Sequence, residues 1–188
     1  LQPVEWFVNK FNDIAWLNPA VWLISRKLGD QAGAWDDRLS LDDDGEYFAG
    51  LVAASTGVRF IGSAKSYYRI CNTGSLSRGT SYKACESLYL SLSLCIKYLL
   101  SLEDSDRTRW ACLNYLNDWL IYFYPEKKEL LRKMSSLAAQ LGGHLVLPTL
   151  GWKYYPIEKL LGTERAKQIR INWGNSKLMM KSKWDKSL

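Results

Sequence analysis

Histidine is almost absent from this sequence of 188 residues, and its four cysteines show no metal-ligand spacing. The cysteines stand at positions 71, 85, 95 and 112, so no pair forms a C-x-x-C motif. Three of them lie in segments of helical periodicity, where cysteine acts as a small apolar side chain. We therefore expect no structural zinc site, a reducing compartment, and a loop role for the single His144.

Long hydrophobic runs are also lacking. No segment reaches the roughly 18 consecutive apolar residues that predict a membrane-spanning helix, and the first residues do not resemble a signal peptide. No internal repeat is present. The composition, with 47% hydrophobic and 23% charged residues, is typical of a globular protein with a real core. The chain starts at Leu1 rather than Met, from which we expect a processed or truncated chain.

Positive charge is concentrated near the C-terminus. Residues 1–125 hold 12 Lys and Arg against 14 Asp and Glu, whereas 126–188 hold 13 against 5. Such a basic tail is either a solvated helical face or a surface for an anionic partner. Tryptophan and methionine alternate with lysine over 172–188, which suits an anionic membrane interface. Nucleic acid is not indicated as a partner, because no recognised binding motif accompanies the charge.

Residues 18–80 mix strand-like and helical patterns. Apolar runs predict short strands at 20–25, 58–61 and 64–70. A short helix closed by Gly33 is expected after the first strand, and a second helix is expected to begin near Asp44. Three short strands make a poor sheet by themselves. The pattern therefore predicts part of a larger α/β sheet whose remainder is not in this sequence.

The pattern from residue 81 onward is wholly helical. Apolar residues recur at intervals of three and four along 82–99, 110–123 and 130–141, and a last helix is predicted near 156–171. Asp104 or Ser105 is expected to cap the second of these helices. We predict a partial α/β sheet with few short strands over 1–80, followed by an α-helical appendage with a basic tail over 81–188. The whole chain is expected to be mostly helical.

Carboxylates crowd into residues 36–46 together with a single arginine. Like charges this close repel one another, so such a cluster usually has a use or lies in water. One interpretation is helix capping in a solvated loop. A second is the binding of a hard cation, and a third is general base catalysis by one aspartate. A glycosidase is not favoured, because its two acids would be separated in distinct environments.

Several short motifs follow one another in a particular order within residues 18–80. They are Trp22-Leu23-Ile24-Ser25-Arg26, Gly33-Ala34-Trp35-Asp36-Asp37, Asp43-Asp44-Gly45-Glu46-Tyr47-Phe48, Gly57-Val58-Arg59-Phe60, Tyr67-Tyr68-Arg69 and Gly74-Ser75-Leu76-Ser77. In this order and at this spacing they resemble the C-terminal half of the family 2 glycosyltransferases, which have the GT-A fold. One departure is Gly50, near which the family often has an arginine.

The resemblance implies roles for particular residues. Asp44 would be the general base that takes the proton from an acceptor hydroxyl during inverting transfer from a nucleotide-diphosphate sugar. Substrate binding would involve Trp35, Asp36, Asp43, Arg69, Ser75 and Ser77. Of these, the first three would shape the acceptor side, and the last three would face the diphosphate. Core packing is the alternative role for Trp35, and an ion pair is the alternative for Arg69.

The resemblance also implies what this chain lacks. The family's nucleotide-binding half ends in an Asp-x-Asp metal motif; Asp42 and Asp44 have that spacing but lie in the wrong part of the pattern. Mg²⁺ or Mn²⁺ is therefore expected only for the complete enzyme, and this chain by itself is expected to be inactive. A cytoplasmic enzyme of cell-envelope polysaccharide synthesis is implied, with a glycan or lipid-linked acceptor and peripheral contact with the inner face of the membrane. The alternative is a non-enzymatic helical interaction module whose basic tail docks on a membrane or polyanion.

Overall fold

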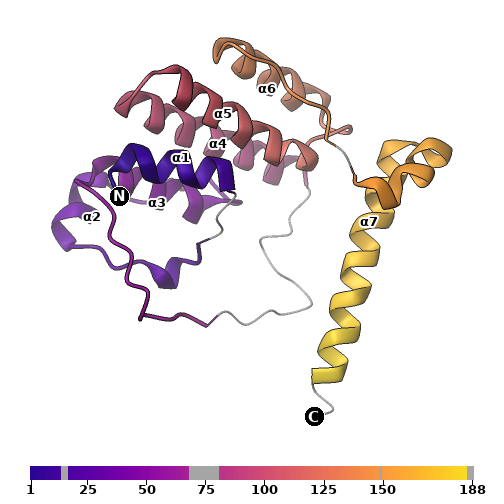
Figure 1. Cartoon of the computed structure of the whole chain (residues 1–188), viewed down its shortest axis with the longest axis horizontal. Helices are drawn as coiled ribbons and strands as arrows, with labels where there is room; N and C mark the ends of the chain where they lie inside the picture. Colours follow the sequence, from indigo (N-terminus) through magenta and orange to yellow (C-terminus); the bar gives the residue numbers. More distant parts are fainter. Residues whose placement is uncertain (14–16, 68–80, 149, 186–188) are drawn as a thin grey trace.

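The computed structural model describes residues 1–13, 17–67, 81–148 and 150–185, and the described part is mostly helical (Figure 1). The α-helices and 3₁₀ helices are α1 Pro3–Asp13, η1 Pro19–Val21, α2 Arg26–Ala32, α3 Asp43–Ala54, α4 Tyr82–Leu102, α5 Asp106–Trp119, η3 Leu120–Tyr122, α6 Lys128–Gln140, η4 Trp152–Tyr154 and α7 Tyr155–Asp185. The prediction of a mostly helical chain is confirmed.

Helix α4 lies at the centre of the core. It packs against α1, α3, α5 and α6, and α1 also contacts α5 and α3 (Figure 1). On one face of this helix, apolar residues recur at helical spacing and are at most 2% exposed: Leu88, Leu92, Cys95, Ile96 and Leu99. Burial of one such large side chain contributes about 1.5–3 kcal/mol to the free energy of folding. The predicted periodicity of this helix therefore marks its buried face.

Among the described residues, α4 is the one helix long and apolar enough, by length and composition, to cross a membrane; its mean hydropathy is 1.3. The same composition is expected of a core helix in a globular protein. Leu88 and Leu92 lie in the hydrophobic core with Phe7 and Phe11 of α1 and Leu116 of α5. Packing inside this fold therefore accounts for the apolar character of α4.

Several helix ends follow the local signals in the sequence. Ser25 caps α2 by accepting a hydrogen bond from the Leu28 N–H at 3.2 Å. Gly33 ends α2 with φ 92°, a conformation in which glycine is unstrained. The prediction that Gly33 closes this short helix is therefore confirmed. Ser105 is the N-cap residue of α5, and its backbone N–H donates to the Thr108 hydroxyl at 3.0 Å. Capping of this helix by Ser105 was one of the two predicted options.

The predicted partial sheet is not formed by the described residues. Part of the first predicted strand, 20–25, lies in η1, and the backbone is extended at Trp22, with φ −95° and ψ 131°. In the second, Val58 exchanges two backbone hydrogen bonds with Leu1, at 2.9 and 2.7 Å, but no strand forms. The third, 64–70, is described only to residue 67, without strand structure. A strand needs a continuous neighbour for its N–H and C=O groups, and the described chain supplies only the Leu1–Val58 pair.

Helices on both sides of residue 80 share one core. Phe7 of α1 and Val52 of α3 belong to the same cluster of buried residues as Leu92 of α4 and Leu116 of α5. Helices α1 and α3 therefore stabilise α4 and α5 and are stabilised by them, although the motifs that resemble a glycosyltransferase all precede residue 81. The acidic segment lies on this shared core.

The last helix, α7, confirms the prediction of a helix near 156–171 and continues to Asp185. Gly162 interrupts it with φ 80°, ψ 162°. Beyond this kink Ala166 is fully buried, and the Lys167 ammonium donates to the Tyr124 carbonyl at 2.7 Å and to the Glu126 carboxylate at 2.9 Å. These contacts fasten the middle of α7 to the helical core, from which its C-terminal part projects (Figure 1).

Candidate functional site

The acidic residues at 36–46 occupy two different environments. Asp36 lies in the loop before α3, where the Arg38 side chain donates to it through Nε at 2.8 Å and through Nη2 at 2.5 Å. The Arg38 backbone N–H donates to the same carboxylate at 3.0 Å. These bonds lower the pKa of Asp36, chiefly through the side-chain hydrogen bond. Asp36 is therefore an ionised partner of Arg38 that shapes the loop.

Asp42 is the most unusual member of the cluster. It precedes α3 in the left-handed conformation with φ 60°, and its side chain makes no capping hydrogen bond. Its carboxylate instead accepts a hydrogen bond of 2.6 Å from the hydroxyl of Ser91 on α4. Burial raises the pKa of Asp42 to about 6, although the Ser91 bond and Lys10 oppose the shift. This aspartate therefore keeps its proton to a higher pH than a fully hydrated aspartate does.

Two serines of α4 hold the start of the acidic segment. The Ser87 hydroxyl accepts from the N–H groups of Ser40 at 2.7 Å and Leu41 at 2.9 Å, and donates to the Leu41 carbonyl at 3.0 Å. Ser91 is one helical turn further on and also donates to the Asp42 carbonyl at 3.1 Å. Sequence reasoning missed both serines. Their signal is the i, i+4 spacing of two serines within the apolar, buried face of α4.

The same side of α4 continues to the buried Glu46 of α3. Glu46 is 6% exposed, and it accepts a hydrogen bond of 2.5 Å from the Tyr98 hydroxyl. Burial and this bond raise the pKa of Tyr98, so the phenol keeps its proton. Ser87, Ser91 and Tyr98 thus form a polar stripe that holds residues 40–46 against α4. Sequence reasoning also missed this buried pair.

The Asp42 carboxylate lies against Gly45 of α3, in the space that a Cβ atom would fill. A Cβ there would stand 2.7 Å from the Asp42 Cγ and in still closer contact with one carboxylate oxygen. Gly45→Ala is therefore expected to destabilise the chain by about 1–3 kcal/mol through overpacking. The measurement is urea unfolding at pH 7.

Gly50→Ala is the matched control, because it is on the same helix and its Cβ would find only ordinary contacts with Tyr98 at 3.6 Å. It is expected to stabilise the chain by about 0.5–1 kcal/mol through helix propensity. Equal stability of the two variants would contradict the close contact between Asp42 and Gly45.

Asp43 and Asp44 are in the first turn of α3 and are half-buried. The Asp44 Oδ1 atom accepts a hydrogen bond of 2.9 Å from the Gly45 N–H. Free N–H groups and the helix dipole favour negative charge at such a position. The expected place of Asp44 at a helix N-terminus is confirmed. Tyr47 follows three residues later on the same helix, so its side chain lies one turn away.

Trp35 takes part in a series of aromatic contacts that reaches the core. Its ring stacks on Tyr47 with centroids 4.4 Å apart and an interplanar angle of 13°. It also meets the edge of Phe48, which stacks on Trp22 at 4.9 Å. Trp35 is nevertheless 44% exposed. The side chain therefore packs on one side and offers its remaining surface to solvent beside the acidic helix.

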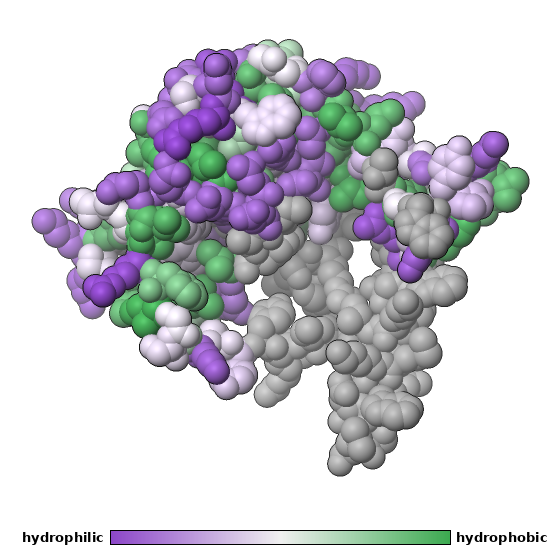
Figure 2. Space-filling view, in the orientation of Figure 1, coloured by the Kyte–Doolittle hydropathy of each residue, from purple (hydrophilic) through white to green (hydrophobic). Residues whose placement is uncertain are grey.

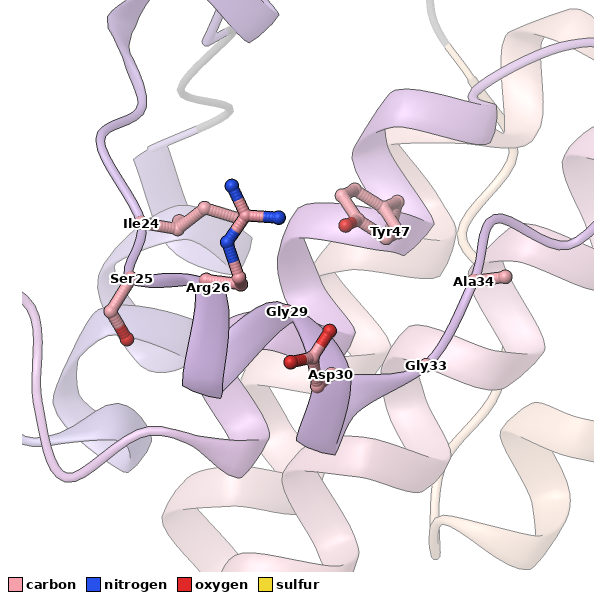
Figure 3. Close-up of a pocket in the computed structure, with 8 residues that line it drawn as sticks. All are labelled: Ile24, Ser25, Arg26, Gly29, Asp30, Gly33, Ala34 and Tyr47. Carbon is pink, nitrogen blue, oxygen red and sulfur yellow. The ribbon is translucent and has the colours of Figure 1, made fainter.

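An open pocket of about 590 Å³ lies between α2 and α3 (Figure 3). It is lined by Ile24, Ser25, Arg26, Gly29, Asp30, Gly33, Ala34 and Tyr47. In Figure 3 the Arg26 guanidinium and the Tyr47 ring face each other, with the Asp30 carboxylate between them and lower. Asp44 does not line this pocket, but Tyr47 connects the two, because it belongs to the pocket wall and to the helix that carries Asp44.

Other predicted site residues are not placed. Arg69, Ser75 and Ser77 lie outside the described residues, as do the side chains of the basic tail over 172–188. Within the described part of the chain, no group of three or more His, Cys, Asp and Glu side chains is arranged to hold a metal ion. The described site therefore consists of the acidic turn, the aromatic wall and the open pocket.

No family model, curated protein or solved structure matches this chain. The likeness of its motifs to family 2 glycosyltransferases thus stays an interpretation of residues 18–80. The function proposed below rests on this interpretation together with the chemistry and geometry of the site.

Proposed function

We propose that this chain is the acceptor-side half of an inverting glycosyltransferase that uses a nucleotide-diphosphate sugar. The observation that carries the proposal is the position of Asp44, half-buried in the first turn of α3 and one turn from Tyr47 in the pocket wall. A general base must be held in direction by its surroundings and must reach the proton that it removes. The Gly45 N–H helps to hold the Asp44 carboxylate in this way.

The proposed reaction needs few groups from this half. Asp44 removes the proton of the acceptor hydroxyl while its oxygen attacks the anomeric carbon, and the nucleoside diphosphate leaves from the opposite face with the bonding electrons. The configuration at the anomeric carbon is therefore inverted. The Trp35–Tyr47 stack offers an apolar wall to a sugar ring, and the pocket provides about 590 Å³ next to it. Asp43 and Asp36 shape the edge of this acceptor site.

The nucleotide-binding half, in this proposal, also completes the sheet. Segments 20–25 and 58–61 would pair as strands with it. Leu23 is 94% exposed and Phe60 is 89% exposed, and apolar side chains appear at the surface in the region of α2 (Figure 2). Contiguous exposed apolar patches are one mark of a surface that another polypeptide covers. We call the chain together with that half the joined enzyme.

The remaining components follow from the same proposal. Mg²⁺ or Mn²⁺ would be bound by the nucleotide-binding half and would neutralise the diphosphate of the donor. Arg69, Ser75 and Ser77 would approach that diphosphate from this chain. The acceptor would be a glycan or a lipid-linked sugar, and the reaction would take place in the cytoplasm at the inner face of the membrane.

The test is the coding region upstream of Leu1 and the activity of its product. We expect it to encode alternating strands and helices that end in an Asp-x-Asp motif. The joined enzyme is expected to release nucleoside diphosphate from a panel of nucleotide sugars in the presence of glycan acceptors and Mn²⁺, whereas the 188-residue chain is expected to release none. Transfer by the isolated chain at the rate of the joined enzyme would contradict the division of the site into two halves.

A further inference from the structure

The acidic segment is attached to α4 by hydrogen bonds at its very start. The Ser87 hydroxyl holds the N–H groups of Ser40 and Leu41, and the Ser91 hydroxyl holds both the carbonyl and the carboxylate of Asp42. The Asp42 carbonyl also accepts the Glu46 N–H at 3.1 Å, which closes the first turn of α3. The geometry of this turn therefore depends on how firmly Asp42 is held.

Asp42 lies at a point where several helices meet. Its carboxylate leans over Gly45 and does not cap α3. Six titratable groups face it from the elements packed around it: Lys10 of α1, Asp43 and Asp44 of α3, Cys95 of α4, Tyr115 of α5 and Tyr122 of η3. A negative charge on Asp42 would thus meet one cation, two further carboxylates and a largely apolar interior.

We propose that Ser87, Ser91 and protonated Asp42 form a clamp that holds residues 40–42 on α4, and that loss of the Asp42 proton loosens this clamp and the first turn of α3. Ionised Asp42 is drawn toward water because burial penalises its charge. Movement of its backbone would strain the bonds from Ser91 and from the Glu46 N–H together, since both end on the Asp42 carbonyl. Burial accordingly raises the pKa of Asp42 to about 6.

The clamp also bears on the proposed base. Asp44 is two residues beyond Asp42, so the direction of its carboxylate follows the geometry of the same turn. Ser87 and Ser91 are positioning residues in this view, because they act on Asp44 only through the backbone of residues 40–46. This consequence for sugar transfer rests on the proposed function, whereas the clamp itself does not.

The experiment is amide hydrogen exchange, followed by NMR on the 188-residue chain at pH 5 and pH 8 and corrected for the intrinsic pH dependence of exchange. The reporters are the N–H groups of Ser40, Leu41 and Glu46, whose acceptors belong to the clamp. Their protection is expected to fall about tenfold or more between pH 5 and pH 8. In Asp42→Asn, which cannot ionise, their protection is expected to stay at one level.

Serine variants test the other half of the clamp. Ser87→Ala is expected to lower the protection of Ser40 and Leu41 about tenfold at both pH values, because their acceptor is removed. Ser93→Ala is the matched control on α4: the Ser93 hydroxyl donates to the Tyr89 carbonyl of its own helix at 2.7 Å and to no reporter, so the reporters should not change. Asp43→Asn should keep the pH response of the wild-type chain.

Two results would overturn the proposal: equal protection of the reporters at pH 5 and pH 8 in the wild-type chain, or a full pH response that persists in Asp42→Asn. Hydrogen exchange of the wild-type chain and of Asp42→Asn can both be measured even where a serine variant fails to fold. In an active joined enzyme, Asp42→Asn should flatten the pH dependence of kcat between these values, whereas a merely structural role would lower kcat equally at both. If the joined enzyme transfers no sugar while the reporters show the expected pH response, the proposed function is rejected and the clamp is still supported.

Discussion

Asp44→Asn is expected to lower kcat of the joined enzyme by about 10²- to 10⁴-fold, the range that a positioned general base contributes. Asparagine has the same size as aspartate and keeps an oxygen that can accept the Gly45 N–H, so the first turn of α3 should be preserved. It cannot accept a proton from the acceptor hydroxyl at neutral pH. The loss should therefore appear in kcat, while the KM for the nucleotide sugar changes little.

The measurement is steady-state release of nucleoside diphosphate, with urea unfolding of each variant as a check of the fold. Asp106→Asn is a suitable control, because Asp106 is also in the first turn of a helix, α5, but is exposed and distant in sequence from the acidic segment. This control should retain the wild-type kcat. A fall of less than threefold in Asp44→Asn, or an equal fall in the control, would remove Asp44 from the role of base.

Asp42→Asn is expected to make the isolated chain more stable at pH 8, by up to about 3 kcal/mol. The folded-state pKa of Asp42 is raised to about 6 from 3.8, and one pKa unit corresponds to about 1.4 kcal/mol. The stabilisation that protonated Asp42 provides is present below the unfolded-state pKa and is lost as the pH rises through about 6. Asparagine, which stays neutral and tolerates the left-handed conformation at this position, avoids that loss.

Urea unfolding at pH 4, 6 and 8 measures this effect as a difference between the variant and the wild-type chain. The two should be similar at pH 4 and diverge above pH 6. Carboxylates whose pKa values are lowered, such as Asp36 and Glu103, lose stabilising bonds in acid, but they do so in both proteins and cancel in the difference. Asp43→Asn should not show the divergence. An Asp42→Asn chain that is less stable than the wild type at pH 8 would reject burial as the cause of the shift.

Local signals in the sequence were enough to predict much of the helical structure. The periodicity of Leu88, Leu92 and Leu99 identifies the buried face of α4, because residues three and four apart share one side of a helix. Ser105 and Gly33 mark helix ends through side-chain and backbone preferences of single residues. The place of Asp44 at the start of α3 belongs to the same class. Helix periodicity and helix ends depend on residues within a few positions of one another in the sequence, so they can be predicted without the tertiary structure.

Strands could not be predicted with the same success. Segments 20–25 and 58–61 have strand-forming composition, but a strand exists only where a neighbour accepts its hydrogen bonds. The described chain offers Val58 only the single residue Leu1 as a partner. Composition gives the preference of a segment for strand structure, whereas pairing depends on a partner segment that is often far away in the sequence. The same residues therefore form no strand here, and Leu23 and Phe60 among them are almost fully exposed.

The acidic cluster shows the same division between sequence and tertiary structure. By itself, the sequence determined that carboxylates gather before a helix and that Asp43 and Asp44 begin it. Only the tertiary structure decided that the half-buried Asp42 accepts a hydrogen bond from Ser91 and that Glu46 meets Tyr98, whereas Asp36 pairs locally with Arg38. Ser91 and Tyr98 lie about fifty positions further along the chain. Asp36 and Asp42 are the same residue type in the sequence, but they differ in environment because the partner of Asp42 comes from α4, which only folding brings to it.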